Sequence, residues 1–191
     1  MGTRSPLRSL GAILAIALSA ALSPAAHAHQ PIPRVGQQLT AEDATAQKVT
    51  MAMETLKTKA SKLGSAKLNG ESTVADKKVP ALFFGATEMN NNFTLVDEVQ
   101  KDVGGTATIF VKSGDEFVRV ATNVRKGDGS RAIGTILDPK GKAIASIKAN
   151  KAFYGEVDIL GKNYATGYEP IFDAEKNIIG IYYVGYLKEA A

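Results

Sequence analysis

The clearest alternation of apolar and polar residues lies near the C-terminal end of the chain, over residues 153–187. β-Branched and aromatic residues form three runs there, and short turns rich in Gly, Asn, Asp and Lys separate them. Such runs are typical of β-strands, and short turns join strands that run antiparallel. The pattern therefore predicts a three-strand antiparallel meander.

Two more strands are predicted upstream of the meander. Residues 106–112 and 116–122 alternate around Ser113-Gly114-Asp115, which indicates a β-hairpin. The residues between hairpin and meander predict a polar loop, an extended segment or short strand, and a short helix, at 123–130, 131–136 and 140–150 respectively.

A long helix is predicted over residues 40–63. Thr40 and Asp43 have the spacing of an N-cap signal, and Gly64 suits the position just after the last turn. Apolar residues spaced alternately by three and four form a narrow stripe: Ala46, Val49, Met53, Leu56, Ala60 and Leu63. This stripe suits packing on the domain's own sheet and also contact with a second copy, and the pattern does not choose between them.

The remaining segment completes an α+β fold class. Residues 65–80 predict a linker that leads into a short strand near 82–84, and a second, short helix is expected between Asn92 and Gly104. Helices separate from an antiparallel sheet are typical of α+β domains. We therefore expect an antiparallel sheet of five to six strands, with a long N-terminal helix and short flanking helices.

The first 28 residues match a secretory signal peptide. Arg4 and Arg8 precede an apolar run over 10–22, and Ala26-His27-Ala28 has small residues where a signal peptidase cuts, so cleavage is expected after Ala28. The apolar run is shorter than the roughly 20 residues of a membrane span. We expect a periplasmic or secreted stand-alone protein.

After such cleavage, residues 29–39 would form a flexible lead-in and residues 40–191 a single domain. Removing Arg4 and Arg8 lowers the net charge from +4 to +2, with no basic cluster that suits nucleic acid. The chain has no Cys, which excludes disulfides and thiolate metal sites.

Histidine content narrows the chemistry further. Cleavage after Ala28 would leave His29 alone, in the lead-in, whereas a Ser-His-Asp triad needs a His within the folded domain. An N-terminal His can chelate copper, but such a site normally needs a second His. We expect no catalysis, no cofactor and no functional metal site.

Three segments in order carry a likeness to a known family: Gly104-Gly105 followed by ATIFVKSGDEFVRVATNV, then GSRAIGTILD, then YGEVDILGKNYATGYEPIFDAEKNIIGIYYVGY. Together they resemble a single Cache domain of type 3, the PAS-like extracytoplasmic sensor module of bacterial chemoreceptors and sensor kinases. The resemblance covers roughly residues 40–187. It implies a ligand pocket on one side of the sheet, and sensing or chemotaxis signalling rather than catalysis.

The resemblance also implies a ligand class and a first binding residue. Characterised relatives often bind small carboxylates or amino acids, and Arg131 aligns with a basic position near the pocket of citrate-sensor-like members. A guanidinium pairs with a carboxylate through two hydrogen bonds and keeps its charge. The alternative is a surface arginine beside Asp128 or Asp138.

Further ligand contacts are implied by the same resemblance: Arg119, Thr122, Tyr154, Tyr164 and Tyr168. In a regular strand Arg119 and Thr122 point to opposite faces, so only a bulge brings both to one pocket. We expect Thr122 to contact ligand and Arg119 to be a solvated strand residue. Relatives tend to carry His at position 122, so Thr there favours a mono- or dicarboxylate over a tricarboxylate. For any single tyrosine, ordinary packing in a strand is the favoured role over ligand contact.

Two functions are thus compatible with the sequence. The first is an extracytoplasmic domain that binds a small carboxylate or amino acid, with a homodimer through the N-terminal helix and a membrane receptor as partners. The alternative is a structural or interaction domain with a vestigial pocket, acting through that helix. The first predicts a polar cavity lined by Arg131 and tyrosines, and the second an apolar or closed one.

Overall fold

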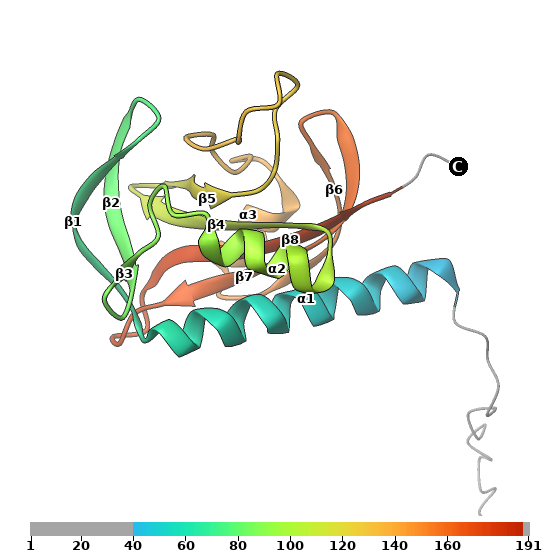
Figure 1. The fold of residues 1–191 in the computed structure, drawn as a ribbon, viewed down its shortest axis with the longest axis horizontal. Coiled ribbons are helices and arrows are strands. Elements are labelled where there is room, and N and C mark those ends of the chain that lie inside the picture. Colours follow the sequence, from blue (N-terminus) through green and yellow to red (C-terminus); the bar gives the residue numbers. More distant parts are fainter. Residues whose placement is uncertain (1–39, 189–191) are drawn as a thin grey trace, which may run out of the picture. The chain divides into compact units, whose positions relative to one another are not determined.

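The structure is a computed structural model that describes residues 40–188, so the predicted leader and lead-in lie outside the described residues. The described chain forms three helices and two antiparallel sheets (Figure 1). This arrangement confirms the predicted α+β, PAS-like fold class. The described strands number eight, because a second sheet accompanies the predicted one.

Helix α1 (Ala41–Leu63) begins where the sequence predicts. The Thr40 hydroxyl accepts a hydrogen bond from the Asp43 backbone N–H at 3.1 Å, and the Asp43 carboxylate accepts one from the Thr40 N–H at 3.2 Å. This reciprocal capping box satisfies two backbone donors that the first turn leaves free. The helix ends at Gly64, whose φ of 126° is a value that L side chains rarely adopt.

One side of α1 packs on the domain itself. Its buried residues are Val49, Ala52, Met53, Leu56 and Ala60. They pack against α2, β7 and β8, whose bounds are given below. Most of the predicted stripe is therefore used within this domain, while Leu63 is exposed. Among the described residues no helix combines the length and the apolar character of a membrane span.

The larger sheet has five strands in the order β5-β4-β8-β7-β6. Their bounds are β4 Thr106–Ser113, β5 Glu116–Thr122, β6 Phe153–Ile159, β7 Lys162–Phe172 and β8 Ile178–Leu187. The β4–β5 hairpin and the β6–β7–β8 meander are the two predicted units. Strand β8 pairs with both β4 and β7, and so joins them into one sheet.

The smaller sheet corrects the prediction of a linker over residues 65–80. Strand β1 (Ala66–Val74) pairs with β2 (Lys77–Phe84), which pairs with β3 (Thr87–Glu88). Most of β1 is exposed on both faces, so it lacks the apolar alternation that marks a half-buried strand. Its turn uses Ala75 at a φ of 55°, where glycine or asparagine is usual.

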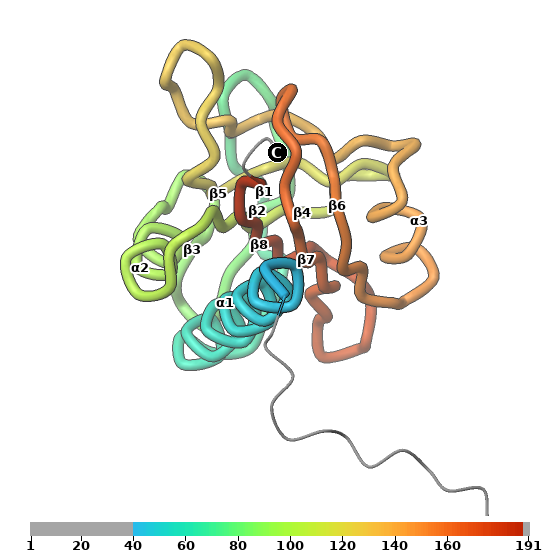
Figure 2. Tube along the Cα trace, turned by 90° about the vertical axis from the view of Figure 1, so that its right-hand side faces the viewer, coloured from blue at the N-terminus to red at the C-terminus, as the bar shows by residue number. Residues whose placement is uncertain are grey.

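Helices α2 (Thr94–Val103) and α3 (Lys142–Lys148) complete the fold. Together with α1, α2 covers one face of the larger sheet, while α3 and the segment 123–141 cover the other (Figure 2). Each face of the larger sheet therefore has a hydrophobic core of its own.

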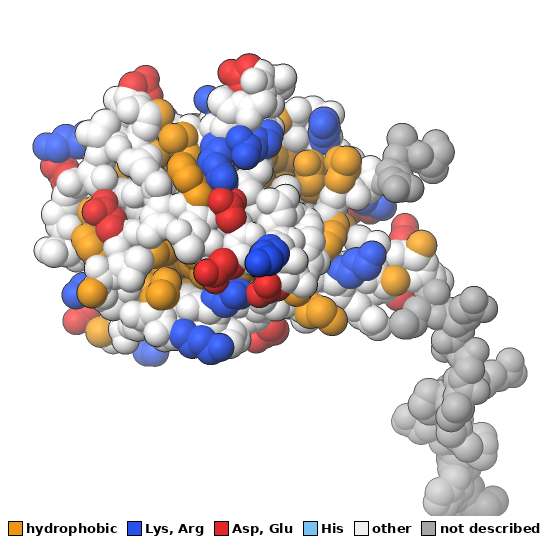
Figure 3. Space-filling model, viewed as in Figure 1, with side chains coloured by type: hydrophobic (Ala, Val, Ile, Leu, Met, Phe, Trp, Pro, Cys, Tyr) orange, Lys and Arg blue, Asp and Glu red, His pale blue; other side chains and the backbone are white. Residues whose placement is uncertain are grey.

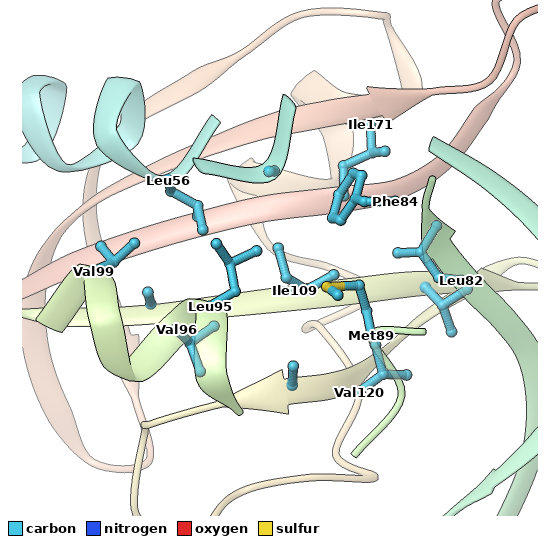
Figure 4. Close-up of a cluster of buried hydrophobic side chains, with 14 of the residues drawn as sticks. Leu56, Leu82, Phe84, Met89, Leu95, Val96, Val99, Ile109, Val120 and Ile171 are labelled. Atoms are coloured by element: carbon cyan, nitrogen blue, oxygen red, sulfur yellow. The ribbon is translucent and has the colours of Figure 1, made fainter. Parts of the chain in front are cut away.

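The helix-side core lies between α1, α2, the smaller sheet and the larger sheet (Figure 4). Its labelled members are Leu56, Leu82, Phe84, Met89, Leu95, Val96, Val99, Ile109, Val120 and Ile171. The loop-side core lies on the opposite face and consists of Phe110, Phe117, Val124, Ala132, Leu137, Ala143, Ile144, Ile147, Ile159, Tyr168, Ile181 and Tyr183. The candidate site belongs to this second core.

Candidate functional site

A β-bulge in the β4–β5 hairpin determines which side chains face the loop-side core. Ile109 pairs with Ala121, but the next residue, Phe110, pairs with Arg119, so Val120 is the extra residue on β5. An extra residue shifts the alternation of every side chain beyond it. Consequently Arg119 and Thr122 lie on one face, as the sequence allowed only with a bulge.

Arg119 is buried within the loop-side core, and the expectation of a solvated strand residue is wrong. Only 5% of its surface is exposed. Nη1 donates a hydrogen bond of 2.8 Å to the Thr135 hydroxyl, and the guanidinium carbon lies 5.1 Å from the centre of the Phe110 ring. Nε is buried and has no hydrogen-bond partner among the described residues. The cause of the error is that both faces of β5 are covered, so the face that carries Phe117 and Arg119 is not open to solvent.

The guanidinium of Arg119 also lacks a counter-ion. None of the ion pairs among residues 40–188 includes it. Burial lowers the pKa of Arg119, and the nearby hydroxyls of Tyr168 and Tyr183 act in the opposite direction. Burial raises the pKa of Tyr168 to about 12, so its hydroxyl is neutral at physiological pH and supplies no negative charge. Arginine keeps its proton even so, and an unpaired buried charge is costly.

The segment 131–137 holds Thr135 beside Arg119. It runs along β5: the Arg119 N–H donates to the Thr135 carbonyl, and the Gly134 N–H donates to the Arg119 carbonyl, both at 2.9 Å. The Leu137 N–H donates to the Phe117 carbonyl at the same distance. Backbone pairing with β5 at Phe117 and Arg119 therefore places the covering segment next to the buried charge.

The space around Arg119 is closed and mostly apolar, unlike the polar cavity that the sensing interpretation predicted. The side chains of α3 lie farther along the same core: Ile144 and Ile147 are buried there, and α3 packs mainly on β6 and β7, at the end of the sheet away from β5. An open groove of about 820 Å³ lies elsewhere, between the first half of α1 and the strands β6, β7 and β8. Thr45, Val49 and Tyr186 are among its lining residues.

Arg131 is held at the edge of the sheet by α2. Its Nη1 and Nη2 each donate a 2.8 Å hydrogen bond to a carboxylate oxygen of Asp97, and Nη1 also donates to the Thr122 carbonyl at 2.8 Å. The guanidinium lies over the Phe93 ring, 4.3 Å from its centre. Its side chain is 19% exposed. The partner is thus neither Asp128 nor Asp138, and both ends of the fork are already occupied.

This clamp links the covering segment to both helices of the other face. Asp97 belongs to α2, which is tied to α1 by Lys59: its ammonium lies 3.0 Å from Glu98 and 3.0 Å from Asp102. On the face drawn in Figure 3, basic and acidic side chains lie close together in this way. If the segment that begins at Arg131 is displaced, it therefore pulls on α2 through Asp97, and α2 pulls on α1 through Lys59.

The predicted tyrosines divide between the two faces of the sheet. Tyr168 is buried in the loop-side core with its ring centre 4.9 Å from that of Tyr183, and Tyr164 packs against the same core. Tyr154 points to the opposite face, is 45% exposed, and donates a 2.6 Å hydrogen bond to Glu169. Burial and this hydrogen bond raise the pKa of Tyr154.

The structure thus brings together four of the six predicted residues: Arg119, Thr122, Tyr164 and Tyr168. Thr122 is fully engaged, because its hydroxyl lies 2.6 Å from that of Thr108. Sequence reasoning did not include Thr135 or Tyr183 in the site. Thr135 lies within the GSRAIGTILD segment that carried the family resemblance, which was the one signal that pointed to it.

Comparison with known proteins identifies the family of the chain. Residues 28–191 match the family described as the Cache 3/Cache 2 fusion domain. The chain belongs to this family, which confirms the predicted resemblance to a Cache domain. Cache domains are extracytoplasmic domains for sensing and ligand binding. No curated protein matches the chain.

The Arg131–Asp97 clamp is expected to stabilise the domain measurably. In a double-mutant cycle of Arg131→Met and Asp97→Asn, monitored by chemical unfolding, we expect a coupling free energy of about 1–2 kcal/mol, since contacting charged pairs typically couple by about 0.5–3 kcal/mol. The exposed pair Lys78–Glu71 is the matched control and should couple by less than about 1 kcal/mol. Equal coupling in both pairs would contradict the assignment.

Proposed function

We propose that this domain senses a small organic anion, a carboxylate or an amino acid, that becomes the counter-ion of Arg119. The observation that carries the proposal is the buried guanidinium, whose Nε is unpaired and which forms no ion pair with a carboxylate of residues 40–188. Buried arginines are ordinarily paired, because removing a charge from water is costly unless a partner compensates. A ligand carboxylate supplies that partner.

The strength of such an interaction is sufficient for sensing. Hydrogen bonds to charged groups contribute about 1.5–3 kcal/mol each, so a two-bond contact with the guanidinium contributes about 3–6 kcal/mol. Each buried methylene of the ligand adds about 0.8 kcal/mol. A micromolar dissociation constant corresponds to about 8 kcal/mol, which a ligand with a few apolar carbons reaches.

Ligand entry requires the loop-side face to open. The segment 131–137 pairs with β5 beside Arg119, whose side chain is buried, so this segment moves outward before a ligand reaches the guanidinium. The Arg131–Asp97 clamp then passes the movement to α2 and, through Lys59, to α1. In this proposal Arg119 contacts the ligand and Arg131 positions the covering segment.

A second candidate function is an interaction domain that acts through α1, by self-association or by contact with a membrane receptor. The closed packing around Arg119 favours it, as does the groove beside α1. Met51 is 61% exposed on α1 and offers an apolar contact to a partner. Under this alternative Arg119 is a structural residue, and its replacement destabilises the domain.

We also infer that the chain is exported with cleavage after Ala28, on the strength of its basic start, its short apolar run and the Ala26-His27-Ala28 site. Intact-mass analysis of the protein recovered from outside the cytoplasm should give the mass of residues 29–191. Recovery of the uncleaved chain from the membrane fraction would show that the leader serves as an anchor.

Replacing the two arginines by methionine should separate a binding role from a structural one. We expect Arg119→Met to leave the free energy of unfolding unchanged or to raise it by up to about 4 kcal/mol, because apolar replacement of a buried charge is often neutral or stabilising. The same variant should lose the thermal shift that carboxylates or amino acids induce in the wild type.

Arg131→Met is the matched control and should lower the free energy of unfolding by about 1–3 kcal/mol, since it leaves Asp97 and the Thr122 carbonyl without their donor. The sensing proposal fails if Arg119→Met is as destabilising as the control. It also fails if Arg119→Met binds carboxylates or amino acids as the wild type does.

A further inference from the structure

The chemical class of the ligand follows from which charges the domain buries. Among the described residues, the buried polar or charged side chains are Asn90, Thr108, Arg119, Thr122, Asn123 and Thr166. Arg119 is the one charged member of this set. A ligand enclosed beside it therefore finds one cation and no anion.

An amino-acid ligand would bring an ammonium group, for which the surroundings of Arg119 offer no carboxylate and too few free hydrogen-bond acceptors. The nearby threonine hydroxyls are already used: Thr135 donates to the Ala132 carbonyl and accepts from Arg119, while Thr122 bonds to Thr108 and accepts from the Val124 N–H. The Tyr183 hydroxyl pairs with Thr106, so among the described residues only the Tyr168 hydroxyl near Arg119 has no hydrogen-bond partner. A buried ammonium needs a carboxylate or several free acceptors. The site therefore disfavours a zwitterion.

A dicarboxylate would bring a second negative charge that also lacks a partner. The nearest candidate cation is Arg131, but its fork is bound to both oxygens of Asp97 and its Nη1 to the Thr122 carbonyl. Replacing Asp97 by a ligand would break the clamp to α2. One negative charge is what this site neutralises.

The side chains around Arg119 favour an apolar remainder of the ligand. Phe110 lies under the guanidinium, and Phe117 and the ring of Tyr168 belong to the same loop-side core. A hydroxyl or amide on the ligand would find little besides the Tyr168 hydroxyl as a partner there, whereas methyl and methylene groups gain from burial.

We propose that the ligand is a monocarboxylate with a short apolar tail, rather than an amino acid or a dicarboxylate. This inference rests on the proposed function, because it takes Arg119 as the anion site. The carboxylate binds the free edge of the guanidinium that includes Nε. The tail replaces contacts that the covering segment makes in the closed domain.

Calorimetric titration of the purified protein with compounds that share one carbon skeleton tests the inference. The reference probe is 4-methylpentanoate; L-leucine adds an ammonium to it, isobutylmalonate adds a second carboxylate, 4-hydroxypentanoate replaces one methyl by a hydroxyl, and 4-methylpentanamide removes the charge. We expect 4-methylpentanoate to bind at least ten-fold more tightly than each of the other four, and Arg119→Met to abolish its binding.

The outcomes separate failure of this inference from failure of the proposed function. If L-leucine, isobutylmalonate or 4-hydroxypentanoate binds as tightly as 4-methylpentanoate, and Arg119→Met abolishes that binding, the ligand class is wrong and the anion site stands. If these probes and a wider panel of carboxylates and amino acids do not bind, or bind equally to Arg119→Met, the anion site itself is overturned.

Discussion

The guanidinium of Arg119 is a positive charge enclosed between aromatic rings and aliphatic side chains, with one hydroxyl as its partner. A folded domain retains such a charge at a cost, since the same space filled by an apolar side chain would be at least as stable. Sites that bind ligands commonly carry costs of this kind, because a group left unpaired in the free protein has its interaction energy available for the ligand. The account of this domain depends on that constraint.

The two arginines of the site show how local geometry decides between structure and binding. Arg131 has a carboxylate, a carbonyl and an aromatic ring around its guanidinium, so its hydrogen-bonding capacity is largely used. Arg119 is more deeply buried and has fewer hydrogen-bond partners, since its Nε has none among the described residues. The family resemblance favoured Arg131 as the ligand contact, whereas the arrangement of partners favours Arg119. Arg131 begins the segment 131–137 and Arg119 pairs with it, so a ligand bound at Arg119 affects the position of Arg131.

Much of the fold was predictable, because it depends on local signals. The capping box at Thr40 and Asp43, the turn at Ser113-Gly114-Asp115 and the β-branched runs of the last three strands are all visible in the sequence. The β1–β2 hairpin was not, because an exposed strand has no buried face to impose alternation. Family membership carried the general role, since residue patterns alone left sensing and interaction open.

The candidate site was predictable only in part, because its geometry depends on contacts between distant residues. The bulge at Val120 brings Thr122 to the same face as Arg119, and nothing in the alternation of residues 116–122 signals it. The partner of Arg131 is Asp97, 34 residues earlier in the chain. Tyr154 and Tyr168 are both tyrosines within predicted strands and look alike in the sequence, yet their side chains lie on opposite faces of the sheet. A charged residue between two valines in a strand was the one local hint at Arg119.

The most direct test observes the Nε–H group of Arg119 itself. In a ¹⁵N-labelled sample, its resonance can be assigned by its loss in Arg119→Lys and followed while 4-methylpentanoate is added. Because Nε–H is unpaired in the free domain, we predict a downfield shift of its proton and slower exchange with solvent as the carboxylate binds. A resonance that stays unchanged while the ligand saturates the protein would contradict the account.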